Sequence, residues 1–240
     1  MDLVRRVGSL LGAAGLDLRG ALSPSVYDAL VPPGWRCDAL LTGARSALVV
    51  GSGGRALWRA ARESGAAGSD PLDLHTARAM HACVTELRAA GHAAVAVFAH
   101  ERRGGTFADF VALAHAAGLG APSRLGLLVH PIYGPWLSLR ALLVSELAWP
   151  ESTPLRSFDP CTGCPAPCAT ACHGAAVGRS GFDVPRCAAT RRRDPRCALR
   201  CGARHACVLG RDHVYLAEAE GHHMRSVSPQ ALLESQGDRT

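Results

Sequence analysis

The chain has 240 residues, 48% of them hydrophobic, which suffices for one large domain or for a domain of about 150 residues with an appended module. All 26 basic residues are arginines, so the chain lacks the lysine that pyridoxal-phosphate enzymes and P-loop proteins need. The formal net charge of +6 would suit nucleic acid, but most of the arginines are scattered among acidic residues, which disfavours that partner.

The N-terminal segment, residues 1–20, carries Arg5-Arg6 before a mildly apolar stretch, a superficial match to a twin-arginine export signal. Asp17 and Arg19 follow without a convincing cleavage site, and the apolar residues recur at helical spacing, so we predict an ordinary first helix. No apolar run reaches the roughly 18 residues that a membrane span needs. Because the apolar half holds only two cysteines, a reducing cytoplasm is favoured over a secreted disulfide framework, and we expect no membrane partner.

Strands and helices alternate along the first 150 residues, which predicts an α/β layer structure. Turns at 23–24 and 32–34 enclose a short segment. Buried strands are expected at 47–50, 93–98 and 125–129, helices at 55–64, 72–90 and 107–117, and a continuation of the sheet at 136–146.

The composition changes at the linker 150–154, so we expect an α/β domain at residues 1–150 and a second domain at residues 151–240. Apolar periodicity is lost after the linker, as expected where metal coordination supplies the folding energy. The tail from Val214 is polar and is predicted to hold one short helix, with residues 236–240 frayed.

A glycine-rich segment, Gly51-Ser52-Gly53-Gly54-Arg55-Ala56, matches the G-x-G-x-x-A form of a dinucleotide loop. No acidic residue ends a second strand about 20 residues later, as dinucleotide-binding folds require. A structural turn from strand to helix is therefore the favoured interpretation.

Eight of the ten cysteines lie between residues 161 and 207, and the run Cys161-x2-Cys164-x3-Cys168-x3-Cys172 approaches the pattern of bacterial two-cluster ferredoxins. In that pattern three close thiolates bind one 4Fe–4S cluster and the fourth binds the other. The expected ligands are Cys161, Cys164, Cys168 and Cys207 for the first cluster, and Cys172, Cys187, Cys197 and Cys201 for the second. The second gap of three residues, His173 in place of proline and the long gap before Cys207 are departures, which leave open an unusual or missing cluster.

The alternative for these cysteines is one or two structural zinc sites of four thiolates, although only Cys161 and Cys164 have the C-x2-C spacing typical of zinc. Cys37 and Cys83 are expected to be buried small hydrophobes. A basic patch lies in the same region, formed by Arg191, Arg192, Arg193, Arg196, Arg200 and Arg204. Because no aromatic residues interleave with it, charge compensation for a reduced cluster or a solvated face is favoured over nucleic-acid binding.

The loop His130-Pro131-Ile132-Tyr133-Gly134-Pro135-Trp136 follows a predicted strand. Rigid, aromatic-rich loops at this place line pockets in open α/β folds, but a turn with packed rings explains the residues equally well.

Residues 117–120 and 128–137 resemble the core motif shared by epoxyqueuosine reductases and the cobalamin-processing decyanase (CblC-like) family. The cysteine region, including residues 182–187, resembles the dicluster domain that epoxyqueuosine reductases carry after that fold, in a short ferredoxin-like form. The resemblance implies a flavin-reductase-like, corrinoid-binding α/β domain followed by a small ferredoxin-like 4Fe–4S domain. It also implies a corrinoid site at His130, Tyr133, Gly134 and Trp136, and tRNA as a partner.

Epoxyqueuosine reductases have a proton-donating aspartate where this chain reads Arg102-Arg103-Gly104-Gly105, so that reaction is not implied and no catalytic residue is assigned. The hypothesis is electron transfer from a redox partner protein through two 4Fe–4S clusters to a corrinoid or a flavin, in a reductase of unknown substrate. A noncatalytic ferredoxin-like carrier or cobalamin chaperone is the first alternative. A zinc-stabilised α/β protein is the second.

Overall fold

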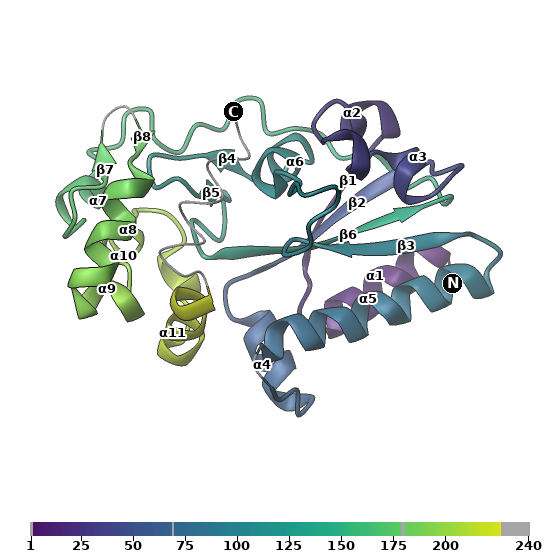
Figure 1. Cartoon of the computed structure of the whole chain (residues 1–240), viewed down its shortest axis with the longest axis horizontal. Helices are drawn as coiled ribbons and strands as arrows, with labels where there is room; N and C mark the ends of the chain where they lie inside the picture. The colour runs from purple at the N-terminus through teal and green to yellow at the C-terminus, as the bar shows by residue number, and fades with distance from the viewer. Residues whose placement is uncertain (1, 69, 179–180, 227–240) are drawn as a thin grey trace. The chain divides into compact units, whose positions relative to one another are not determined.

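The computed structural model describes residues 2–68, 70–178 and 181–226 (Figure 1). Internal contacts divide the chain into two units, the first formed by Met1–Leu119 and Ser138–Arg156 and the second by Gly120–Leu137 and Ser157–Thr240. The segment 120–137, which carries the His130 loop, therefore groups with the cysteine-rich region rather than with the N-terminal residues that precede it.

Unit 1 contains a four-stranded sheet with the order β1-β2-β6-β3. Its strands are β1 (Leu18–Leu22), β2 (Ser46–Gly53), β3 (Ala94–Phe98) and β6 (Leu137–Ser145). β1 pairs antiparallel with β2, and β3 pairs antiparallel with β6, so that Gly20 lies opposite Val49 and Ala96 opposite Leu143. Every residue of β2 is buried, as expected for a central strand with both faces covered.

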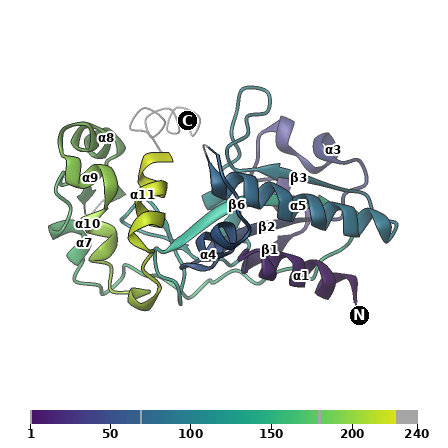
Figure 2. The same cartoon turned by 90° about the horizontal axis from the view of Figure 1, so that it is seen from below.

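Helices cover both faces of this sheet. They are α1 (Leu3–Ala13), α2 (Pro24–Asp28), α3 (Cys37–Leu40), α4 (Ala56–Glu63), α5 (Pro71–Ala89) and α6 (Phe110–Ala116), with a 3₁₀ turn, η1, at Pro33–Trp35. Figures 1 and 2 show α1 and α5 side by side along one face, and α2 and α6 on the other. The main core joins Leu11 of α1, Val50 of β2 and Met80 of α5, which are all fully buried.

Most elements predicted for this unit are confirmed within a few residues, because local capping fixes their ends. The Asp70 carboxylate accepts from the backbone N–H of Asp73 at 2.9 Å, and Pro71 occupies the first position of α5. Asp109 accepts from the N–H groups of Val111 and Ala112, so α6 begins three residues later than the predicted helix 107–117. The N-terminal segment is an ordinary helix that buries Val7 and Leu11.

The glycine-rich segment is part of a strand, not of a loop. β2 continues to Gly53, beyond the predicted end at residue 50, and the turn into α4 falls at Gly54, whose φ is +58°. A side chain at Gly51 would meet the carbonyl oxygen of Ser138 in β6. Close packing between two strands explains this glycine without a nucleotide.

Unit 2 is built from short elements. They are β4 (Ala121–Pro122), β5 (Leu128–Val129), α7 (Pro167–Thr170), β7 (Val177–Gly178), β8 (Gly181–Phe182), α8 (Val184–Arg193), α9 (Pro195–Leu199), α10 (Gly202–His205), the 3₁₀ turn η2 (Arg211–His213) and α11 (Ala217–Ser226). The short helix predicted after Val214 is confirmed as α11, and residues 236–240 lie outside the described residues.

The predicted strand 125–129 is wrong in extent and place. Only Leu128–Val129 is extended, and it pairs with β4 in a separate two-stranded ribbon instead of joining the sheet. The cause is a turn, in which Gly126 has φ +68° and its N–H donates to the carbonyl of Ser123 at 3.1 Å. The predicted continuation of the sheet at 136–146 is confirmed as β6.

One apolar cluster of unit 2 includes cysteines. Leu125, Cys168, Val177 and Ala203 form its buried centre, with Cys172, Cys201 and Cys207 packed against them. Among the described residues, none of the helices combines the length and apolar character of a transmembrane segment.

Candidate metal centre

The first group of thiols gathers around α7. The four cysteines Cys161, Cys164, Cys168 and Cys207 line one small cavity, and they are called tetrad one below. Ala166 adopts a left-handed conformation with φ 56°, and Pro167 then starts α7, which holds Cys168 in the buried core. The backbone N–H of Arg124 donates to Cys161 Sγ at 3.4 Å, so residues 120–137 touch this tetrad directly.

The second group of thiols lies along α8 and α9. Cys172, Cys187, Cys197 and Cys201 line a cavity of about 500 Å³ and are called tetrad two. Asp183 and Asp194 cap the N-termini of the two helices. Asp183 accepts from the backbone N–H of Arg186 at 2.9 Å, and Asp194 accepts from that of Arg196 at 3.0 Å. The N–H of Ala176 donates to Cys172 Sγ at 3.3 Å. The structure thus gathers the eight cysteines into the same two groups of four that the ferredoxin pattern predicts.

The sulfur separations bear on which metal fits. All ten cysteines are free thiols. Among the described residues, no three cysteine sulfurs lie within 4.8 Å of one another. Zinc holds each sulfur at about 2.3 Å in a tetrahedron, which requires sulfur–sulfur distances of about 3.8 Å. A 4Fe–4S cluster instead binds each thiolate at a different iron corner and keeps the sulfurs farther apart. The wider spacing of the thiols suits a cluster, whereas the one compact metal-binding group among the described residues is formed by His173, Asp194 and Cys197.

Burial opposes ionisation of these thiols. Desolvation raises the pKa of Cys187 to about 11, and the thiols of Cys201, Cys172 and Cys197 add to this. Desolvation also raises the pKa of Cys207, while backbone N–H groups that donate to its sulfur act in the opposite direction. Without a cation these sulfurs hold their protons at neutral pH, and a bound metal would supply the charge that stabilises the thiolates.

Arg191 offers an unpaired donor beside tetrad two. It lies in the last turn of α8, lines the 500 Å³ cavity and lowers the pKa of the Cys187 thiol. Its terminal nitrogen donates to the carbonyl of Met224 in α11. Its buried Nε has no hydrogen-bond partner among the described residues. A buried donor of this kind calls for an acceptor, and the sulfur atoms of an iron–sulfur cluster would provide one, so these residues fit that group.

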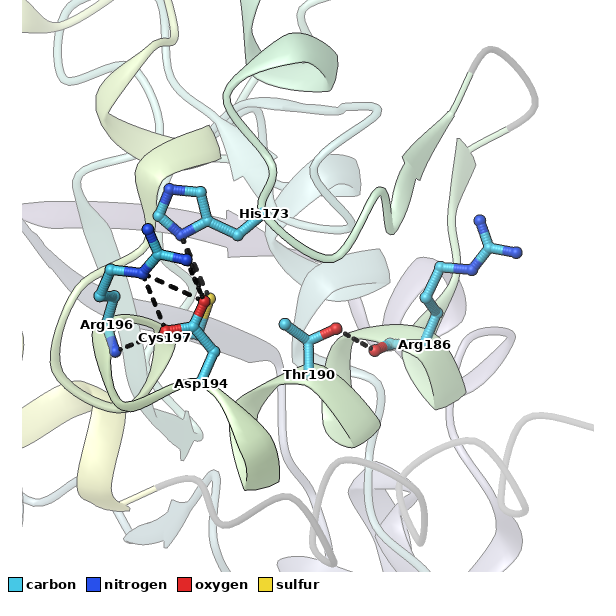
Figure 3. A network of polar contacts seen from close by, with 6 residues as sticks. All are labelled: His173, Arg186, Thr190, Asp194, Arg196 and Cys197. Atoms are coloured by element: carbon cyan, nitrogen blue, oxygen red, sulfur yellow. Dashed lines mark hydrogen bonds and ion pairs between the residues drawn. The ribbon is translucent and has the colours of Figure 1, made fainter.

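His173, which replaces the expected proline, sits against tetrad two (Figure 3). Its Nδ1 lies 3.8 Å from Cys197 Sγ and 3.8 Å from an oxygen of Asp194. Hydrogen bonds from Arg196 are the largest cause that lowers the pKa of Asp194. This carboxylate is therefore charged, and it lies close to both His173 and Cys197.

The His130 loop is closed by its own backbone. The N–H and carbonyl of His130 pair with those of Gly134 at 2.9 and 2.8 Å. His130 Nδ1 accepts from the backbone N–H groups of Ile132 at 3.0 Å and Tyr133 at 3.2 Å. In the neutral ring the proton must then reside on Nε2, which is a hydrogen-bond donor.

The aromatic residues of this loop pack against the chain around and after the last two cysteines. The Tyr133 ring lies 4.8 Å from that of His213, while Trp136 is 1% exposed and stacks under the Arg204 guanidinium at 4.7 Å. Arg204 also donates twice to the carbonyl of Pro135, at 3.0 and 2.6 Å. The four residues predicted for the corrinoid thus share one loop, in which His130 and Tyr133 are partly exposed and Trp136 is a packing residue.

Sequence reasoning missed the residues of α11 that support tetrad two. Glu220 is buried, and its carboxylate accepts from the N–H of Cys201 at 3.2 Å and faces His205 Nε2 at 2.8 Å. Tyr215, which precedes α11 and is also buried, packs against Arg204 at 4.7 Å. The one signal in the sequence was an aromatic residue in an otherwise polar tail.

No protein-family model and no curated protein matches the sequence. Solved structures do match the fold. An epoxyqueuosine reductase bound to an epoxyqueuosine-modified tRNA-Tyr stem loop is 15% identical, with a TM-score of 0.61 over 92% of this chain and 69% of the reductase. The B12-trafficking protein CblC of C. elegans is 15% identical, with a TM-score of 0.58 over 96% of this chain and 94% of CblC.

A reductive dehalogenase, whose structure suggests a mechanism for B12-dependent dehalogenation, is 16% identical. Its TM-score is 0.53 over 96% of this chain, which spans 36% of the dehalogenase. At such identities the likeness concerns the fold alone. The chain has the mixed α/β fold shared by epoxyqueuosine reductases and CblC, as the motif resemblance implied.

Proposed function

We propose that this chain is an iron–sulfur redox protein that passes single electrons through two 4Fe–4S clusters to a corrinoid. The observation that carries the proposal is the gathering of eight free thiols into two separate groups of four, each of which lines one cavity. In this proposal Cys161, Cys164, Cys168 and Cys207 hold the first cluster. The second is held by Cys172, Cys187, Cys197 and Cys201.

We infer the order of electron transfer from the residues that line the cavity of each tetrad. Val129, directly before His130, lines the cavity of tetrad one, so the first cluster would stand next to the His130 loop. Tetrad two is bordered by partly exposed and exposed residues of α9, and the second cluster would receive electrons there. Bound clusters supply reversible one-electron storage, and the protein sets their spacing and potential.

A corrinoid is favoured over a flavin as acceptor because the matched folds include a B12-trafficking protein and a protein linked to B12-dependent dehalogenation. His130 would act there as a donor through Nε2 and not as a cobalt ligand, because its Nδ1 is occupied by two backbone N–H groups. Tyr133 and Gly134 would shape the same edge of the site.

A second candidate is a corrinoid-handling protein without a further substrate. It is supported by the likeness in fold to the B12-trafficking protein CblC, with a TM-score of 0.58. In that case the clusters would reduce the corrinoid for transfer to another protein.

The test begins with protein purified without oxygen. About eight irons and eight sulfides per chain, with visible absorbance that bleaches on dithionite, are expected for two clusters. Colourless protein with zinc in place of iron would refute the proposal. Titration with cobalamin then tests the acceptor. The His130→Ala variant should bind cobalamin at least about tenfold more weakly, because it loses the hydrogen bond from Nε2 and the contacts that Nδ1 makes within the loop. Unchanged affinity would reject the role of His130.

Turnover separates the two candidates. Single reduction of a stoichiometric amount of corrinoid, followed by its release to an acceptor protein, supports the handling role. Repeated consumption of reductant in the presence of a third compound supports a reductase.

A further inference from the structure

The last turn of α8, the helix α9 and the residue after it carry an arginine-rich surface, of which only Arg200 lines the cavity of tetrad two. Arg192, Arg193, Arg196 and Arg200 are exposed, and they are called the α8–α9 arginine surface below. Within residues 191–200 the only acidic residue is Asp194, whose carboxylate binds Arg196 at 2.8 Å. The four exposed arginines and this aspartate leave a net charge of +3.

An exposed apolar residue lies between two of these arginines in the sequence, Arg196 and Arg200. Leu199 is 52% exposed, although it is a large aliphatic residue at the end of α9. An exposed apolar residue surrounded by like charges is typical of a transient protein interface, where the charges orient the encounter and the apolar centre makes the contact.

The same surface borders tetrad two. Cys197 lies in α9 between Arg196 and Leu199 and is only partly buried. Arg200 is exposed and also lines the cavity that the four thiols share. A molecule seated on this surface would therefore rest next to the second cluster.

The chemistry of the surface favours a protein over nucleic acid. Residues 184–205 contain no Phe, Tyr or Trp, so bases would find nothing on which to stack. The apolar Leu199 has no counterpart on a phosphate backbone. Both features suit a carrier protein with acidic side chains around an apolar patch.

We propose that the α8–α9 arginine surface is the docking site for an acidic one-electron carrier protein, which reduces the second cluster. This inference rests on the proposed function and names the partner of its electron-entry end. One electron passes from the reduced carrier to the oxidised cluster, so that the carrier leaves oxidised by one electron and the cluster is reduced by one. No bond is formed or broken in the chain.

The experiment uses the iron-loaded full chain and an acidic flavodoxin in its fully reduced form. Stopped-flow absorbance follows reduction of the clusters at several salt concentrations. The test variant is Arg192→Glu with Arg193→Glu, which leaves Arg196 and the network around Asp194 intact. The matched control is Arg59→Glu with Arg62→Glu, which makes the same charge change on exposed positions of α4 in unit 1.

For the wild type and the control we expect a second-order rate that falls as salt rises, and for the test variant a rate at least about tenfold lower at low salt. Reduction by dithionite should be equal in all three. Equal flavodoxin rates for the test variant and the control would overturn the inference. So would salt-dependent binding of a tRNA stem loop that the test variant abolishes while its flavodoxin rate is kept.

Iron and sulfide analysis of the same preparations distinguishes the two levels of failure. An iron-loaded chain whose reduction by flavodoxin does not depend on Arg192 and Arg193 overturns only the docking site. A chain without iron overturns the proposed function, and electron entry with it.

Discussion

The sharpest consequence of the two tetrads concerns Cys172. By sequence it is the fourth member of the close run that starts at Cys161, and a simple reading would give all four to one cluster. In the structure Cys172 lines the cavity of tetrad two with Cys187, Cys197 and Cys201. Replacement of Cys172 should therefore remove the same cluster as replacement of Cys201, which is 29 positions further along the chain.

The magnitude is a count of metal atoms. With two clusters the chain carries about eight irons, and either Cys172→Ala or Cys201→Ala should reduce this to about four. The double variant of these two positions should also keep about four, because both ligands serve one cluster. Cys172→Ala combined with Cys207→Ala should leave about zero, because one ligand is lost from each tetrad.

Iron and acid-labile sulfide analysis on anaerobic protein gives the counts, and EPR spin integration after reduction gives the number of clusters that remain. Cys83→Ala is the control, since Cys83 is fully buried in unit 1 and far along the chain from both tetrads. It should keep about eight irons. The reasoning is refuted if the pair Cys172 and Cys201 loses all iron.

Three further outcomes follow from single contacts. Arg191→Gln removes a positive charge and the unpaired Nε donor beside tetrad two. If this destabilises the reduced second cluster by about 1.4 kcal/mol relative to the oxidised one, its midpoint potential should fall by about 59 mV, and an unchanged potential in an EPR redox titration would contradict this role of Arg191. Burial raises the pKa of Cys83 from 9.0 to about 12, so the contribution of its protonated thiol to the free energy of unfolding is fully present below pH 9 and is lost as the pH rises towards 12. Cys83→Ala should flatten that fall in denaturant titrations at increasing pH, and an identical pH profile would exclude the thiol as its cause. Gly134→Ala should lower the free energy of unfolding by about 1–3 kcal/mol, because φ is +57° and a Cβ would collide with the carbonyl of Leu209. The control Gly163→Ala, where φ is +73° and no atom is close, should lower it by about 1 kcal/mol, and equal losses in thermal unfolding would show that the collision at Gly134 is relieved.

The fold of unit 1 could largely be predicted because its signals are local. Asp70 with Pro71, and Asp109, mark helix starts through contacts within three residues. β1 was missed because it is only five residues long and contains Arg19 and Gly20. Gly20 is required by a distant partner, since a side chain there would meet the carbonyl of Ala117. No local pattern contains that information.

The same division applies to the metal centre. Cysteine spacing is a local property, so the run from Cys161 to Cys172 predicts a metal site and the grouping of its fourth cysteine with a second set. The supporting contacts are not local. Arg191 reaches Met224 across 33 residues, and Cys201 reaches Glu220 across 19. Both depend on where α11 packs, which no periodicity of a polar tail could reveal.

The placement of residues 120–137 gives the strongest link between the thiols and the His130 loop. Val129 lines the cavity of tetrad one and Leu137 that of tetrad two, so the loop is bounded by one tetrad at each end. Arg204, which donates to the carbonyl of Pro135, lies in the sequence between Cys201 of tetrad two and Cys207 of tetrad one. Because both ends and the middle of the loop are fixed by ligand-bearing segments, loss of either cluster should disturb His130. A corrinoid site at this loop would then exist only in the metal-loaded protein, which couples cofactor binding to the presence of the electron source.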